Sequence, residues 1–213
     1  MHYRILTVRD GPPLMKLFNS FYFDVEPLSK HLRLGRISRW LSVLEMWALL
    51  DENISVGAFN KDGHLVGATV NSMESRTELE TGFASNYPVY TRIMPNRSCQ
   101  LVRITDQLAA MSARKHPHIK DWFVVNYTAV HPDFRCRGIA SKLWKLSIEK
   151  AAQVQAGGVH ACAVSPVTFK TLSKFSFVSS GHIVCKDYVD LEGRKILRGL
   201  VELDQLHAMS LEI

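Results

Sequence analysis

Apolar residues recur every three or four positions in five segments of the chain, which is the spacing of a helix with one buried face. The first such segment follows the Gly11-Pro12-Pro13 break, since proline fits the first turn of a helix, and it stops near Pro27, since proline disfavours helical geometry in the residue before it. The other predicted helices are Ile37–Leu50, Ser98–His116, Gly138–Gln155 and Val167–Phe175.

Runs of β-branched and aromatic residues separate these helices and predict strands. The predicted strands are Tyr3–Val8, Ile54–Phe59, Leu65–Met73, Trp122–Val130, Val159–Val164, Phe177–Val189 and Ile196–Leu203. Residues 74–95 are polar and broken, which predicts a mobile loop or a loop with short helical pieces. Helices placed between strands favour an α/β fold with a partly parallel mixed sheet, and no linker-like stretch divides residues 1–213, so we expect one domain.

Composition agrees with a single globular domain. The chain has 213 residues, of which 46% are hydrophobic and 22% charged, and a domain of this size buries roughly 70% of its unfolded surface. The net charge of +6 suits a ligand with phosphates, but the basic residues are scattered, so we expect no nucleic-acid binding.

The cysteines and histidines predict no metal centre. No cysteine pair has the spacing of a zinc or redox motif, and His116-Pro117-His118 has no third ligand nearby in the sequence, so we interpret it as a loop. Isolated cysteines are typical of a reducing compartment. No apolar run reaches the roughly 18 residues of a membrane span and the first residues are unlike a signal peptide, so we expect a cytoplasmic protein without membrane contact.

The junction between the strand that ends at Val130 and the following helix suits a phosphate group. The strand that ends at Val130 is followed by a basic turn, Arg135–Ala140 (Arg-Cys-Arg-Gly-Ile-Ala), and then by a helix. Unpaired N–H groups at a helix start carry partial positive charge and suit a phosphate, and glycine lets the backbone approach it closely. The junction lacks the glycine patterns of P-loops and of dinucleotide-binding folds.

Arg-x-x-Gly-x-Ala after a strand ending in Val-His-Pro resembles the acetyl-CoA motif of the GNAT acetyltransferase superfamily. Three segments, Phe21–Leu28, Val130–Arg135 and Asp187–Asp190 followed by Gly193, are similar to insect arylalkylamine N-acetyltransferases. The resemblance implies a single GNAT-like α/β domain. Its mixed, mostly antiparallel, twisted sheet would have about seven strands flanked by helices, splayed between the fourth and fifth strands where acetyl-CoA binds.

The resemblance also implies a cofactor site for acetyl-CoA. The turn would bind the pyrophosphate, the preceding strand would pair with the pantetheine arm, and a backbone N–H of that strand would stabilise the oxyanion. The implied cofactor-binding residues are Thr128, Ala129, Val130, Arg135, Cys136, Arg137, Gly138, Ile139, Ala140 and Ser141.

Glu26, in Glu-Pro-Leu, is implied as the general base, and its aromatic neighbours could desolvate it. From the residues alone, the favoured interpretation of Glu26 is a solvent-facing carboxylate at a helix end, and the resemblance favours the catalytic role. Ser165 and Thr168 are the candidates for protonating the thiolate, although here the stretch departs from the family pattern and Ser165 could cap the next helix. The candidate substrate-binding residues are Tyr22, Pro27, Tyr188 and His207, the last in the C-terminal tail.

The resemblance implies acetylation of a small primary amine of the arylalkylamine class, such as dopamine, tyramine, octopamine, tryptamine or serotonin. The same chemistry on agmatine or a polyamine is the alternative, because Glu74, Glu78 and Glu80 would suit a second positive charge. A non-catalytic acyl-CoA-binding module and a protein lysine acetyltransferase, with a peptide docked on residues 77–95, are the other classes considered. We expect a monomer whose partners are the amine and acetyl-CoA.

Overall fold

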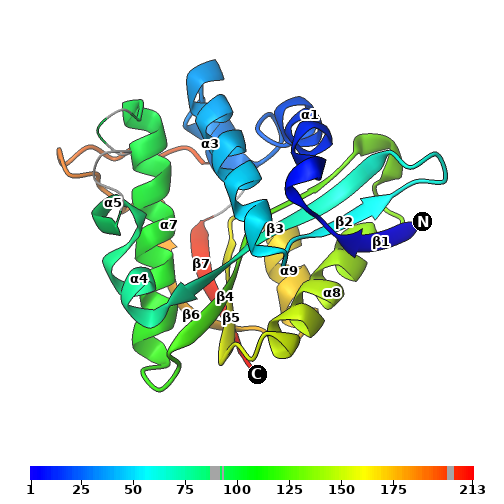
Figure 1. Ribbon diagram of the computed structural model, residues 1–213. Helices are drawn as coiled ribbons and strands as arrows, with labels where there is room; N and C mark the ends of the chain where they lie inside the picture. Colours follow the sequence, from blue (N-terminus) through cyan, green and yellow to red (C-terminus); the bar gives the residue numbers. More distant parts are fainter. Residues whose placement is uncertain (87–91, 93, 201–203) are drawn as a thin grey trace.

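The computed structural model describes residues 1–86, 92, 94–200 and 204–213 (Figure 1). Parts of two predicted segments lie outside the described residues: 87–91 and 93 of the predicted loop, and 201–203 of the predicted last strand.

One mixed sheet of seven strands, in the order β1-β2-β3-β4-β5-β7-β6, forms the centre of the fold. The strands are β1 (His2–Ile5), β2 (Val56–Phe59), β3 (Leu65–Ser75), β4 (Asp121–Val130), β5 (Gly158–Ala163), β6 (Val178–Val184) and β7 (Gln205–Glu212). All neighbouring pairs are antiparallel except β4 and β5, which are parallel. The expected mixed, mostly antiparallel sheet is therefore confirmed.

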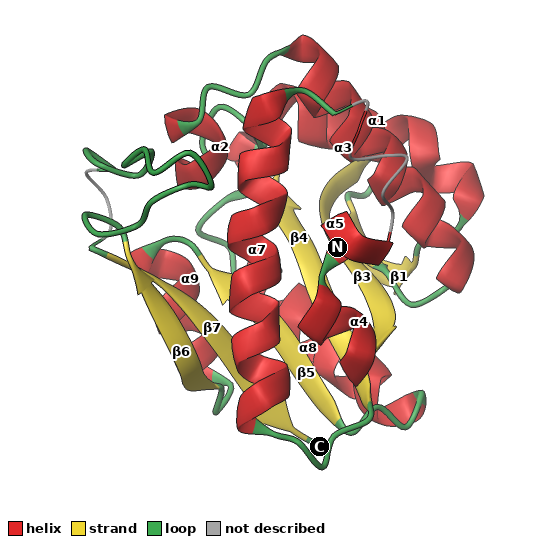
Figure 2. Cartoon of the chain, turned by 90° about the vertical axis from the view of Figure 1, so that its left-hand side faces the viewer, coloured by secondary structure: helices red, strands yellow, loops and turns green. Residues whose placement is uncertain are grey.

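Helices cover both faces of this sheet. The α-helices are α1 (Gly11–Phe21), α2 (Pro27–His31), α3 (Arg36–Ala48), α4 (Arg76–Thr81), α5 (Phe83–Asn86), α7 (Asn96–Lys115), α8 (Ile139–Gln153) and α9 (Pro166–Lys174), and the 3-10 turns are η1 (Val8–Asp10), η2 (Leu49–Glu52) and η3 (Pro132–Phe134). Helices α1, α3 and α7 lie on one face, and α8 and α9 lie on the other (Figures 1 and 2). Among the described helices, none combines the length and apolar composition that a membrane crossing requires.

Apolar clusters fill the space on each side of the sheet. Phe18, Met46 and Leu108, from α1, α3 and α7, belong to one buried cluster. Trp144 of α8 and Leu172 of α9 belong to another. The predicted helical periodicity thus places the main helices correctly, because burial of an apolar stripe drives their docking on the sheet.

Strands β4 and β5 separate after a short parallel pairing. The pairing joins Trp122–Val125 with Gly158–Ala161, and β4 then continues to Val130 beside β3 alone within the described chain. A bulge makes Asn126 an extra residue opposite β3, because Val70 pairs with Tyr127 while Asn71 pairs with Val125. The expected splay between the fourth and fifth strands is confirmed.

The end of the chain differs from the sequence prediction. The last strand is Gln205–Glu212, whereas residues 196–199 form a turn and β6 already ends at Val184. The last strand contains Gln, His, Ser and Glu, so its local pattern does not favour a strand. It forms because it pairs with both β5 and β6. His207 therefore lies in the sheet and not in a tail.

The predicted helix at 37–50 is present as α3, but its buried face is different. Ile37 and Trp40, which fit the apolar periodicity, are 68% and 53% exposed. Ser38, Ser42 and Met46 are buried instead. Small hydroxyl side chains let the helix approach its neighbours closely, which a count of apolar residues does not reveal.

Candidate functional site

The turn between β4 and α8 has the geometry of an anion site. Helix α8 begins at Ile139, so the N–H groups of its first turn have no acceptor within the helix and carry partial positive charge. Gly138 precedes it with φ 75° and ψ 5°, in the left-handed region, and Cys136 has φ 56°. The residues from Arg135 to Gly138 are exposed, so a phosphate could approach these N–H groups directly.

Arg135 fixes this turn to two other elements. Its Nε donates to the carbonyl oxygen of Val130 at 3.0 Å, and its Nη2 donates to that of Phe21 at 3.4 Å. The rings of Phe21 and His131 lie 4.3 Å apart, which adds a second contact between the end of α1 and the turn. The guanidinium thus braces the turn while leaving its charge beside the predicted phosphate position.

Helix α8 is held against β3 by buried polar contacts. The hydroxyls of Ser147 and Thr69 lie 2.9 Å apart, and Asn71 Nδ2 donates to Ser147 Oγ at 3.2 Å. These contacts lie more than one helical turn beyond the start of α8. They fix the direction in which the first-turn N–H groups point.

Glu26 lies between α1 and α2 and is 9% exposed. It caps α2: its Oε1 accepts from Leu28 N at 2.9 Å and its Oε2 accepts from Ser29 N at 2.6 Å. Pro27 is buried at the first position of the same helix, where its missing N–H costs nothing. The sequence alternative of a solvent-facing carboxylate is therefore wrong, because the carboxylate is buried and directed by two backbone donors.

Aromatic side chains place Glu26 beside the splay. The ring of Tyr22 lies 5.2 Å from Phe18 and 6.0 Å from Tyr127 of β4. Burial raises the pKa of Tyr22 well above its usual value, with smaller contributions from Glu26 and Cys162. Cys162 lies on β5, so Glu26, Tyr22 and both diverging strands share one neighbourhood.

An acidic cluster of Glu45, Glu74 and Asp106 faces the same neighbourhood from α3, β3 and α7. Tyr127 Oη donates to Glu45 Oε2 at 3.4 Å. Ser72 Oγ donates to Glu74 Oε1 at 2.9 Å, and Asn126 Nδ2 donates to Ser72 Oγ at 2.8 Å. Within the described chain, neither Glu45 nor Glu74 has a basic side chain at ion-pairing distance.

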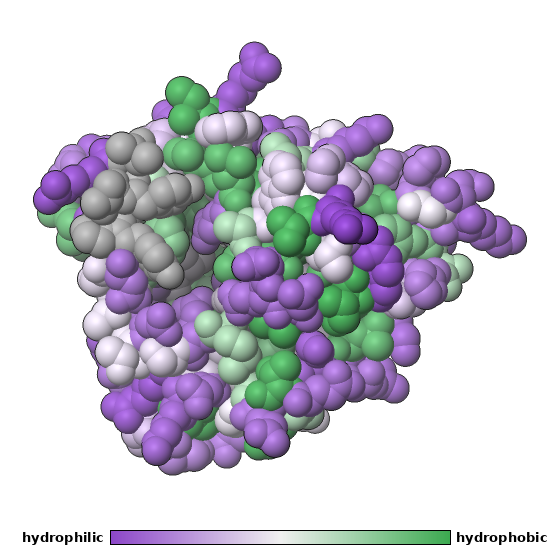
Figure 3. Space-filling model, in the orientation of Figure 1, coloured by the Kyte–Doolittle hydropathy of each residue, from purple (hydrophilic) through white to green (hydrophobic). Residues whose placement is uncertain are grey.

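The acidic groups of this cluster raise one another's pKa values and that of Cys162. Burial raises the pKa of Glu45 to about 7, the bond from Tyr127 opposes this shift, and Glu74 and Asp106 add to it. Burial, followed by Asp106, Glu26 and Glu74, raises the pKa of Cys162 to about 12. A protein with net charge +6 therefore holds a cluster of carboxylates in its interior. The coloured surface over α4 and the lower part of α7 is largely hydrophilic (Figure 3).

Of this cluster, only Glu74 was predicted from sequence to bind a second positive charge. Of the other two residues named for a second charge, Glu78 caps α4 at Ser75 and Glu80 pairs with Arg76 at 2.9 Å. Glu45 had a detectable signal in the sequence, because it lies four residues after Leu41 and three before Ala48, within the apolar stripe that predicts this helix. A charged residue on a buried helix face is a candidate for function.

Ser165 and Thr168 lie at the start of α9, directly after β5. Ser165 Oγ accepts from Thr168 N at 3.0 Å, and the two hydroxyl oxygens lie 2.8 Å apart. The alternative that Ser165 caps this helix is therefore confirmed. Its role in protonating a thiolate stays a prediction that the cap does not exclude.

His207 and Tyr188 lie in different places. His207 packs on Phe169 of α9 at 4.6 Å between ring centroids, and its Nδ1 lies 3.3 Å from Ser179 Oγ. Burial, with a smaller contribution from His182, lowers the pKa of His207. It thus lies on the α9 face of the sheet and is not grouped with Glu26. Tyr188, by contrast, lines a surface hollow of about 230 Å³ together with Asp106 and so borders the acidic cluster.

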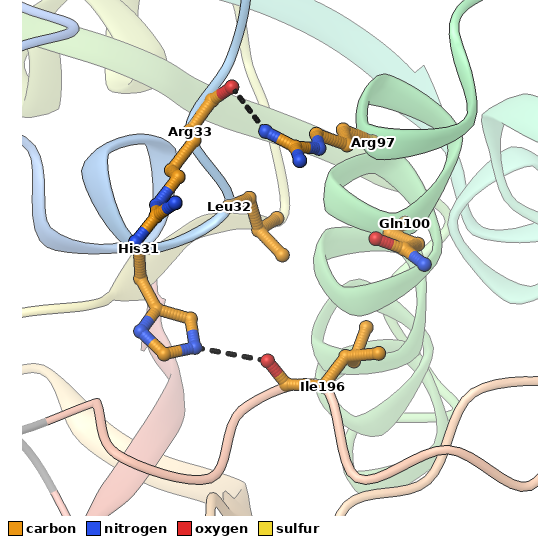
Figure 4. A pocket seen from close by; sticks show the side chains of 6 residues that line it. All are labelled: His31, Leu32, Arg33, Arg97, Gln100 and Ile196. Atoms are coloured by element: carbon orange, nitrogen blue, oxygen red, sulfur yellow. Dashed lines mark hydrogen bonds between the residues drawn. The ribbon is translucent and has the colours of Figure 1, made fainter.

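A second hollow, of about 340 Å³, lies between α2, α7 and the segment after β6 (Figure 4). Arg97 Nη1 donates to Arg33 O at 3.0 Å, and His31 Nε2 lies 2.9 Å from Ile196 O. None of the predicted site residues lines it. Its polar groups hold the three segments together.

Solved structures of insect acetyltransferases share this fold. A polyamine N-acetyltransferase from Drosophila melanogaster, described as catalysing formation of N-acetylagmatine, aligns over 100% of this chain and 99% of its own, with TM-score 0.85 and 14% identity. Arylalkylamine N-acetyltransferase 2 from Aedes aegypti aligns over 100% and 98%, with TM-score 0.82 and 19% identity. A search among curated proteins finds no match to the sequence.

The sequence matches the model of one protein family. The model described as acetyltransferase (GNAT) family matches residues 14–168, which include β4, the turn after it and α8. Because this match covers well over half of the sequence, the chain belongs to this family of acyltransferases, which use acetyl-CoA.

Proposed function

We propose that the chain transfers the acetyl group of acetyl-CoA to the primary amine of a small substrate, with Glu26 as the general base. One observation carries the proposal. The buried Glu26 carboxylate lies with Tyr22 beside the splay between β4 and β5, while Arg135 ties the end of α1, which leads into the Glu26 segment, to the turn before α8.

The strand geometry selects the groups that would face the thioester. His131 N donates to Val66 O at 2.8 Å, so the N–H groups of alternate residues in β4 point toward β3. The N–H groups of Thr128 and Val130 therefore point toward the splay, whereas that of Ala129 points toward β3. Thr128 and Val130 would pair with the pantetheine arm, and one of them would donate to the oxyanion.

The reaction would then proceed through residues in these positions. Glu26, directly or through water, takes a proton from the ammonium group. The free amine attacks the thioester carbon, its nitrogen then releases a second proton to water, the C–S bond breaks, and the thiolate receives a proton. Ser165 and Thr168, at the end of β5, are the proposed donors of that proton. The turn from Arg135 to Ser141 would hold the pyrophosphate throughout.

The favoured substrate class from sequence is an arylalkylamine, and the partly exposed rings of Tyr22 and Tyr127, 6.0 Å apart, would contact its ring. The acidic cluster favours the second candidate, a substrate with two positive charges such as agmatine or a polyamine. Two of its carboxylates lack a described basic partner, and a second ammonium or guanidinium group would supply one.

The two classes predict different pH dependence. The pKa of Glu45 is about 7, so its carboxyl is largely neutral at pH 6 and largely ionised at pH 8. For a dicationic substrate we expect KM to fall about tenfold as pH rises from 6 to 8, because ionised Glu45 attracts the distal charge. The variant Glu45→Gln should lose most of this change, which steady-state kinetics at each pH would measure. Equal KM profiles for the two proteins would exclude Glu45 from substrate binding.

A panel of amines tests the proposed substrate class. Release of free CoA would be followed with acetyl-CoA and tyramine, tryptamine, agmatine, spermidine and a lysine-containing peptide. Higher kcat/KM for the small amines than for the peptide supports the proposal, and the ratio of tyramine to agmatine separates the two classes. Tight CoA binding without turnover on any amine would favour an acyl-CoA-binding module instead.

A further inference from the structure

Two histidines and a glutamate meet at the C-terminal end of α7, and none of the three belongs to the residues of the proposed reaction. His116 ends α7, His118 lies in the loop that follows, and Glu212 lies at the end of β7. Figure 2 shows the lower end of α7 beside the C-terminus. A third ligand is not evident near the two histidines in the sequence, because Glu212 lies 96 residues after His116 and comes close to it only through the pairing of β7.

The ligand atoms have nearly the spacing of a metal site. His116 Nδ1 lies 2.6 Å from Glu212 Oε1, and His118 Nε2 lies 3.6 Å from Glu212 Oε2. One ligand atom from each of the three residues lies within 4.8 Å of the others. Ligands around a tetrahedral zinc ion at about 2.0–2.1 Å are separated by roughly 3.4 Å. The side chains of His118 and Glu212 are 64% and 55% exposed, so small rotations would bring the three ligand atoms to the separations of a tetrahedral site.

Neighbouring side chains orient the His116 ring so that its Nδ1 faces Glu212. Its Nε2 lies 2.9 Å from Ser210 Oγ, which in turn lies 2.5 Å from Ser180 Oγ. If Nε2–H donates to Ser210, then Nδ1 directs a lone pair at the Glu212 carboxylate. At 2.6 Å, Nδ1 and Glu212 Oε1 share a proton, and a metal ion that replaced this proton would bind both atoms once they had moved to roughly 3.4 Å from each other. Histidines that bind metal ions usually donate their other ring N–H to a carboxylate, a backbone carbonyl or water, and the Ser210 hydroxyl would take that place here.

We infer that His116, His118 and Glu212 form a zinc-binding site, with water in the fourth position. Two imidazoles and one carboxylate suit Zn²⁺ and exclude hard cations such as Mg²⁺, which prefer oxygen ligands. The ion would tie the loop after α7 to the last strand. The site is separate from Glu26 and from the turn before α8, so it is independent of the proposed function.

Calorimetric titration of the full chain with Zn²⁺ tests the inference, with His118→Ala, Glu212→Gln and the control His64→Ala. His64 is also exposed but lies next to the β2–β3 turn, away from the cluster. We expect one Zn²⁺ per chain, at least tenfold weaker binding in His118→Ala and Glu212→Gln, and unchanged binding in His64→Ala. Co²⁺ should give the visible absorption of a tetrahedral site only in the wild type and in His64→Ala.

The alternative is a proton between His116 and Glu212. It predicts no saturable Zn²⁺ binding, or equal binding in all four proteins, and either result would overturn the inference. His118 is exposed, so its variant should fold, and circular dichroism would check this. Mg²⁺ in place of Zn²⁺ should give no heat of binding, since saturable Mg²⁺ binding would contradict the ligand assignment.

Discussion

The variant Glu26→Ala is expected to lower kcat/KM for amine acetylation by about 10²-fold or more, the scale of lost general-base catalysis. Most of the loss should appear in kcat, because the base acts when the amine is deprotonated. Steady-state release of CoA would measure it. The structure adds a complication, since Glu26 also caps α2 through two backbone N–H groups.

The variant Glu26→Asn separates the two roles. Asparagine is among the best helix caps, so it should keep the capping contribution, typically about 1 kcal/mol, but it cannot accept a proton. We therefore expect Glu26→Asn to unfold near the wild-type midpoint in urea and still lose about 10²-fold in kcat/KM. Recovery of activity in Glu26→Asn, with loss only in Glu26→Ala, would mean that the carboxylate serves the fold and not the reaction.

A methyl group at Gly138 is expected to raise KM for acetyl-CoA about tenfold, which is about 1.4 kcal/mol of lost binding. A Cβ built there meets no protein atom within 4 Å, so the protein itself has room for it. It would instead occupy the space through which a pyrophosphate approaches the N–H groups of α8. Acetyl-CoA titrations of Gly138→Ala at saturating amine would measure the effect.

Gly63→Ala is a matched control for the backbone strain. Gly63 has φ 80°, close to the φ of 75° at Gly138, and its Cβ also meets nothing within 4 Å. Both variants should lose roughly 1–2 kcal/mol of stability, because L-residues avoid the left-handed region. Only Gly138→Ala should change KM for acetyl-CoA. The same KM in both variants would place the pyrophosphate elsewhere.

Local pattern predicted much of the fold. The strand before Val130, the turn from Arg135 and the helix after Gly138 follow one another in the structure as the sequence indicates, because each depends on neighbours within a few residues. The helix covering 37–50 was also predicted, but its buried face includes Ser38 and Ser42. Its orientation depends on packing against elements distant in the sequence, which apolar spacing does not report.

The features that sequence reasoning missed all depend on long-range pairing. Strand β7 forms through β5 and β6 despite its polar composition, and it alone brings Glu212 to His116. Glu45 and Asp106 lie on helices about 60 residues apart in sequence, and they act on one another only because α3 and α7 cover the same face. The position of the candidate base, Glu26, depends on local sequence instead. Its carboxylate caps α2, which could have been predicted from Glu-Pro at a helix start.

Identification of the product tests the central claim most directly. Wild type and Glu26→Asn would be incubated side by side with acetyl-CoA and the best amine of the panel, and the products analysed by mass spectrometry. If Glu26 is the general base of an amine acetyltransferase, the wild type should form N-acetylated amine and free CoA in equal amounts. Glu26→Asn should form both products at least 10²-fold more slowly. Intact acetyl-CoA in the wild-type reaction, or release of CoA without an acetylated amine, would contradict this claim.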